Sequence, residues 1–99
     1  MENSIKKIFQ SAIEELNEQL EESEKIIYSK NVKLIGSNAA LDSMAFVTLV
    51  TIIEELVEDE LDVSVEIVSD KAFSRTNSPF SCIGMLEEFV LELVREAKE

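Results

Sequence analysis

One stretch decides how this chain is organised: Leu41-Asp42-Ser43-Met44-Ala45-Phe46-Val47-Thr48-Leu49-Val50-Thr51. A polar Asp-Ser pair follows apolar residues and precedes a long segment in which apolar residues recur at helical spacing. This pattern is typical of the first residues of a helix. Ser43 is therefore expected at a helix N-terminus, with Asp42 as the N-cap. Unpaired backbone N–H groups and the positive end of the helix dipole favour a negative group there, so a phosphate ester on the Ser43 hydroxyl would be well placed.

This helix is expected over residues 43–60, with an apolar arc that forms core. The arc comprises Ala45, Phe46, Leu49, Val50, Ile52, Ile53, Leu56 and Val57. Met44 and Val47 fall instead on the polar arc, beside Ser43. Two explanations stay open. The preceding connection covers them, or they form an apolar contact patch that docks a basic partner together with acids further along the helix. The acids expected to take part in docking are Glu54, Glu55 and Glu58.

A first amphipathic helix is expected over residues 4–22, because apolar residues recur there at helical spacing. These residues are Ile5, Ile8, Phe9, Ala12, Ile13, Leu16 and Leu20. A long connection over 23–41 follows, in which Gly36-Ser37-Asn38 is turn chemistry. A short helix around 24–28 is left open there. The residues expected to anchor the connection to the helices are Tyr28, Val32, Leu34 and Ile35.

The remaining part of the chain contains one more long helix. Residues 61–67 alternate like a strand but have no partner, so an extended connection with Val63, Val65 and Ile67 turned inward is expected. A short helix over 69–73 and a loop over 75–79 follow. The last helix is expected over 81–97, weakened near its start by about 1 kcal/mol at Gly84. The predicted class is an all-α bundle of three longer helices and one short one, with a long first loop.

Length and composition indicate one domain over residues 1–99 with a single core. The formal net charge is −12, which argues against binding nucleic acid and favours partners with basic surfaces. No apolar run approaches the length of a membrane span, and the N-terminus has no signal-peptide pattern. Cys82 is the only cysteine, so nothing indicates an oxidising compartment. A cytoplasmic monomer is expected.

The residue types needed for unaided catalysis are scarce. The chain has no His and one Cys, which excludes a Ser-His-Asp triad, a Cys-His pair and a zinc cluster. The acidic run at 58–62 lacks the alternating ligands and central Gly of an EF-hand loop. No glycine-rich phosphate cradle is present. The domain is therefore not expected to be an enzyme, and no metal site is expected.

The stretch Leu41-Asp42-Ser43-Met44 resembles the Asp-Ser-Leu attachment motif of acyl carrier proteins, with Met in place of Leu. The segments Leu34-Ile35-Gly36-Ser37-Asn38, Ile53-Glu54-Glu55 and Ser78-Pro79-Phe80-Ser81 support the likeness. It covers nearly the whole chain in the order and length of the expected elements. The tripeptide by itself gives little support for the resemblance. At the start of the second of four helices in an acidic domain, it becomes fairly specific.

The resemblance implies that Ser43 carries 4′-phosphopantetheine, added from coenzyme A by a phosphopantetheinyl transferase. The protein would then be a phosphoprotein that carries acyl groups as thioesters in fatty acid or lipid biosynthesis. Its other partners would be acyl-transferring or acyl-activating enzymes with basic docking surfaces. The family also holds acyl chains between its helices. Candidate lining residues, each also an ordinary core residue, are Phe46, Leu49, Val50, Ile53, Val63, Val65, Ile67, Phe73 and Phe89.

The sequence departs from the family at two points, and these departures bear on the kind of pathway in which the expected carrier would act. Positions two and five after the serine, often acidic in fatty-acid carriers, are Ala45 and Thr48. The charge instead lies in the far half of a longer helix. Both features favour a carrier of a dedicated pathway over one for bulk fatty-acid synthesis.

A second interpretation needs no prosthetic group. In it the domain is an unmodified acidic helical adaptor, and Ser43 is only a helix-capping serine. The adaptor would dock a basic protein through Met44, Val47 and the carboxylates of the same helix. The two interpretations differ in whether the Ser43 hydroxyl is needed.

Overall fold

The computed structural model describes residues 2–34, 39–74 and 78–98, and its regular structure there is helical. The long helices are α1 (Glu2–Asn17), α2 (Ser43–Leu61) and α4 (Ile83–Lys98). A 3₁₀ turn, η1 (Glu22–Glu24), and a single helical turn, α3 (Asp70–Phe73), lie in the connections. No strand occurs within these ranges, so the all-α class is confirmed. None of the described helices has both the length and the apolarity to cross a bilayer.

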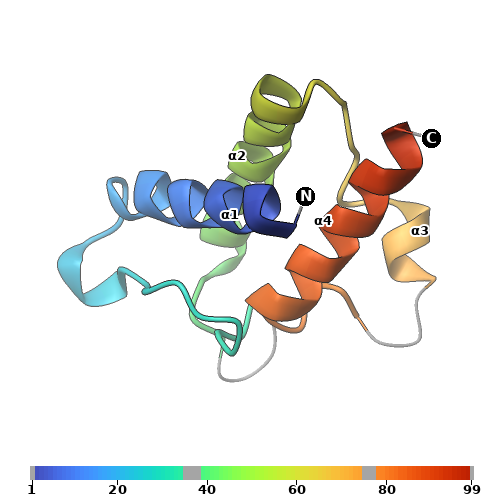
Figure 1. The fold of residues 1–99 in the computed structure, drawn as a ribbon. Coiled ribbons are helices and arrows are strands. Elements are labelled where there is room, and N and C mark those ends of the chain that lie inside the picture. The colour runs from blue at the N-terminus through green and yellow to red at the C-terminus, as the bar shows by residue number, and fades with distance from the viewer. Residues whose placement is uncertain (1, 35–38, 75–77, 99) are drawn as a thin grey trace.

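The three long helices share one core. In Figure 1, α2 and α4 both start at the lower side of the molecule and run upward, and α1 runs crosswise in front of α2. The first helix packs against both of the others. Its buried face matches the predicted one, with Ile5, Ile8, Phe9, Ala12, Ile13 and Leu16 buried. This arrangement brings the first turns of α2 and α4 to the same end of the molecule.

The first helix ends at Asn17, not at Glu22 as its periodicity predicts. The reason is a side chain. Asn17 Nδ2 donates to the Ile26 carbonyl at 2.8 Å, and the Ile26 amide donates to Asn17 Oδ1 at 2.9 Å. This pair of hydrogen bonds fastens the connection to the end of the helix, and Leu20, expected on the helix, packs against the core from the connection instead.

The connection between α1 and α2 is anchored as predicted by Tyr28, Val32 and Leu34. Ile35 and the turn at 36–38 lie outside the described residues. The short helix left open at 24–28 is replaced by η1 at Glu22–Glu24. The connection is thus long and mostly irregular, and packing holds it in place.

The connection also caps the last helix, which starts at Ile83 and not at Ser81. The Ile83 amide donates to the Val32 carbonyl at 2.9 Å, and the Gly84 amide donates to the Lys30 carbonyl at 3.0 Å. These bonds satisfy two N–H groups that a helix start leaves unpaired. A Cβ added to Gly84 would lie 3.1 Å from Lys30 Cβ and 3.2 Å from the Lys30 oxygen. Glycine therefore permits this close approach of the connection.

The segment after α2 is extended, as predicted. Asp62 ends the helix in the left-handed conformation, φ 58° and ψ 35°, and its amide donates to the Glu58 carbonyl. Val63 and Val65 are half-buried and Ile67 is buried. The predicted short helix at 69–73 corresponds to α3, where Ala72 is buried and Ser69 makes no side-chain capping hydrogen bond. Residues 75–77 and the side chain of Phe73 lie outside the described part.

Candidate functional site

The candidate site begins with the N-cap of α2, which forms as the sequence predicts. Asp42 has extended backbone angles, φ −78° and ψ 177°, and its Oδ1 accepts from the Ala45 amide at 2.8 Å. The Asp42 carbonyl accepts from the Phe46 amide at 2.9 Å. Two bonds from one residue fix the first turn. Ser43 is the first residue of the helix and is exposed, so its hydroxyl sits on a rigid base and is reachable from solvent.

An open hollow of about 400 Å³ lies beside Ser43. Its lining comes from both the connection and α2, and comprises Leu34, Ala39, Leu41, Asp42, Ser43, Phe46 and Val47. Most of these side chains are apolar. The Phe46 ring meets Phe80 edge to face, with centroids 5.4 Å apart and an interplanar angle of 81°, a geometry that holds aromatic pairs in place. The wall of the hollow next to Ser43 is therefore apolar, and the contact with Phe80 holds the Phe46 ring of this wall in place.

Met44 and Val47 are both exposed, at 82% and 60% of their surface. The interpretation that the connection covers them is therefore wrong, and they form an apolar patch at the surface. Val47 also lines the hollow. Exposed apolar side chains gathered in this way mark contact sites more often than single exposed ones do.

The three acids proposed for docking have different surroundings. Glu54 is half-buried, and its Oε2 accepts from the Ile67 amide at 2.9 Å. Glu55 and Glu58 are exposed. At 1.5 Å per residue, Glu55 lies about 18 Å along the helix axis from Ser43. The fold thus places Ser43 and Val47 in the lining of the hollow, leaves Met44 exposed next to Ser43, and places the acids further along the same helix.

Neither a protein-family model, nor a curated protein, nor a solved structure matches this chain. Among the described residues, no group of three or more His, Cys, Asp or Glu is placed to hold a metal ion. What the site can do therefore has to be inferred from its geometry and from the motif that it carries.

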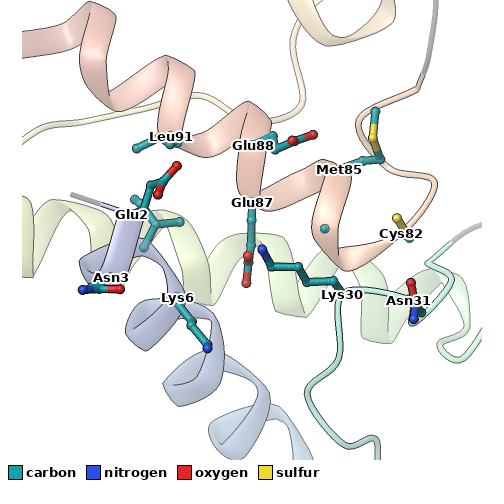
Figure 2. Close-up of a pocket in the computed structure, with 12 residues that line it drawn as sticks. Glu2, Asn3, Lys6, Lys30, Asn31, Cys82, Met85, Glu87, Glu88 and Leu91 are labelled. Carbon is teal, nitrogen blue, oxygen red and sulfur yellow. The ribbon is translucent and has the colours of Figure 1, made fainter.

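A second cleft of about 510 Å³ lies between the start of α1 and the first half of α4 (Figure 2). Carboxylates and lysines both line it. Figure 2 shows Lys30 extending from the connection toward Glu87 of α4, with Lys6 on α1 on the other side. Cys82 is half-buried and is among the residues that line this cleft. The cleft lies where the connection between α1 and α2 packs against α4.

Glu87 is the residue of this cleft that sequence reasoning missed. Glu87 is buried, with 8% of its surface exposed, and it accepts a hydrogen bond from the Tyr28 hydroxyl. Burial, the hydrogen bond and the charge of Glu87, in that order, raise the pKa of Tyr28 well above its usual value. Because the two residues are far apart in sequence, the helical pattern around Glu87 gives no sign of the contact.

Proposed function

We propose that the protein is an acyl carrier in which 4′-phosphopantetheine is attached to Ser43. The observation that carries the proposal is an exposed serine hydroxyl on the first residue of a capped helix, within the Asp-Ser-Met motif and beside an apolar hollow. In this proposal, α1, α2 and α4 with the short α3 form a carrier-type four-helix arrangement. The protein acts in the cytoplasm, in a dedicated pathway.

The residues around Ser43 fit the group. A phosphate on the hydroxyl lies at the positive end of the α2 dipole. Asp42 engages the amides of Ala45 and Phe46, so the amides of Ser43 and Met44 are the two in the first turn that it does not engage. These N–H groups are oriented toward the helix start, where the phosphate would be attached. The apolar hollow accommodates the less polar atoms of the group that follow the phosphate.

Attachment would form one bond and break one. The Ser43 oxygen bonds to the phosphorus that carries pantetheine in coenzyme A, and the bond from that phosphorus to adenosine 3′,5′-bisphosphate breaks. The serine proton leaves to a base of the transferase. The bound group then supplies the thiol on which acyl groups are carried as thioesters. The protein contributes a rigid attachment point and a negatively charged surface for its partners.

The surface of α2 supports repeated, short-lived docking. Met44 and Val47 provide apolar contact next to the attachment point, and Glu55 and Glu58 are exposed further along. Exposed charges chiefly raise the rate of association with an oppositely charged partner and add little to its final affinity. Such a surface suits a carrier that must bind a transferase and several acyl-handling enzymes and then leave each one.

The test is loading by a transferase. Purified protein is incubated with coenzyme A and a broad-specificity phosphopantetheinyl transferase, and its intact mass is measured. Wild type should gain the mass of one group, and Ser43→Ala should gain none. Ser11→Ala, an exposed serine on α1, is the matched control and should load like wild type. Absence of the gain in wild type, or its presence in Ser43→Ala, would contradict the proposal.

The exposed patch of Met44 and Val47 equally favours a second function, an unmodified adaptor for a basic protein. Under this alternative, Ser43→Ala remains fully active in cells, and the exposed acids become essential. The charge test should use Glu55→Lys with Glu58→Lys. Glu54 is unsuitable because its carboxylate accepts from Ile67 inside the protein. Loss of cellular activity in Ser43→Ala, with the fold intact, favours the carrier.

A further inference from the structure

The hollow beside Ser43 lies on the outer side of α2, where the connection passes the first two turns of the helix. Leu34 and Leu41 are buried beneath it, with 1% and 7% of their surface exposed. Val47 stands at its edge and is 60% exposed. The hollow is therefore lined mainly by apolar side chains and is open to solvent. It differs from the interior between the helices, where Leu49 and Ile53 have no exposed surface.

Ser43 is itself part of the lining, so any group on its hydroxyl starts at the mouth of the hollow. In phosphopantetheine, the phosphate is followed by one methylene and then by a carbon that bears two methyl groups. These methyls form the first bulky apolar group along the arm. The polar amides and the thiol come later.

We infer that the hollow holds these geminal methyl groups, so that the first part of the arm rests on the outer side of α2. The inference rests on the proposed function. Burial of methyl groups against Leu41 and Val47 removes apolar surface from water on both sides. The phosphate meanwhile stays at the helix start, and the amides and thiol extend into solvent. The first part of the arm is thus oriented by the protein while the thiol end stays mobile.

The hollow is suited to this ligand by its place and its polarity. Among the lining residues that the structure describes, Asp42 alone is charged, and its carboxylate is already engaged with the Ala45 amide. The other described lining residues are Ser43 and apolar side chains. An occupant tethered to Ser43 enters at a very high effective concentration, so even weak apolar contact is enough to seat it.

The experiment is nuclear magnetic resonance on the loaded protein. Protein with ¹³C-labelled methyl groups is loaded from unlabelled coenzyme A, and cross-relaxation is measured between the geminal methyls of the arm and the protein methyls. Cross-peaks are expected to Leu34, Leu41 and Val47. Two variants should abolish them after complete loading: Val47→Glu, which removes the apolar edge, and Ala39→Phe, which fills the hollow. Val68→Glu, an exposed apolar residue outside the hollow, should retain them.

The outcomes separate this inference from the proposed function. A protein that loads on Ser43 but shows no cross-peaks to the hollow overturns the inference and leaves the carrier function standing. Cross-peaks to the interior methyls of Leu49 and Ile53 overturn it as well, because the arm then enters the bundle. Failure of wild type to load overturns both. Persistence of the cross-peaks in Ala39→Phe, with the fold intact, overturns the inference as well, because the methyls then contact these residues without occupying the hollow.

Discussion

Asp42 ties the sequence motif to the geometry of the attachment point. Its side chain caps α2 through the Ala45 amide, so the residue next to Ser43 has a structural task that does not depend on any prosthetic group. Replacing it with Ala should lower the free energy of unfolding by about 1 kcal/mol, the usual cost of losing an N-cap. Urea denaturation measures this. Asp42→Asn, which keeps an acceptor oxygen, should lose less, and equal losses in the two variants would contradict the capping role.

The contact between Tyr28 and Glu87 predicts a pH dependence. The folded state keeps the phenol protonated because the pKa of Tyr28 is raised there, whereas in the unfolded chain the phenol ionises near pH 10. The contribution of Tyr28 to stability is therefore complete below pH 10 and is lost progressively as the pH rises above it. Lysines titrate in the same range, so the measurement is the difference from Tyr28→Phe. Thermal unfolding from pH 8 to pH 11 should show a steeper decline in wild type than in the variant.

At the scale of the elements, local signals were enough to place α2. A polar pair, an apolar run and the loss of periodicity after Glu60 predict its start and nearly its end, because the cap and the buried face both lie within the helix. The end of α1 and the start of α4 could not be predicted. Asn17 bonds to Ile26, and Ile83 and Gly84 bond to the connection. Helical periodicity gives no information about contacts between residues that are far apart in the sequence.

The same distinction applies to the candidate site. The serine, its cap and the two misplaced apolar residues lie within six positions of one another, so the sequence predicts all of them. The hollow could not be predicted, since Leu34 and Ala39 reach it from the connection. The roles of the acids were also hidden. Sequence gives Glu54 and Glu55 the same chemistry, and the fold uses only Glu54 to hold the segment after α2.

This difference between the two acids predicts unequal effects of the same substitution. Glu54→Ala removes the acceptor of the Ile67 amide and should lower the free energy of unfolding by about 1 to 2 kcal/mol. Glu55→Ala, at an exposed position, should change it by less than about 0.5 kcal/mol. Urea denaturation of both variants provides the comparison. A loss at Glu55 as large as that at Glu54 would contradict the special structural role that the bond to Ile67 gives Glu54.

At the scale of the whole molecule, charge is distributed very unevenly. No Lys or Arg occurs between Lys33 and Lys71, while nine acids do. They are Asp42, Glu54, Glu55, Glu58, Asp59, Glu60, Asp62, Glu66 and Asp70. The segment from 34 to 70, which holds these nine acids, includes all of α2, so the element that carries the proposed attachment point lies in the most acidic part of the chain. A basic partner would be steered toward the helix that it must contact.

Repulsion among these negative charges should lower the stability of the fold at low ionic strength. The negative charges that make up the net charge of −12 repel one another. An ion pair on the described surface, Lys25 with Glu22 at 3.1 Å, is exposed and offsets little of this repulsion. Raising KCl from about 0.01 M to about 0.1 M shortens the Debye length from about 30 Å to about 10 Å, below the 12.8 Å radius of gyration. The urea midpoint should therefore rise with salt. Glu55→Gln with Glu58→Gln should show a smaller rise, and a midpoint that is flat or falls with salt in wild type would mean that self-repulsion does not limit stability.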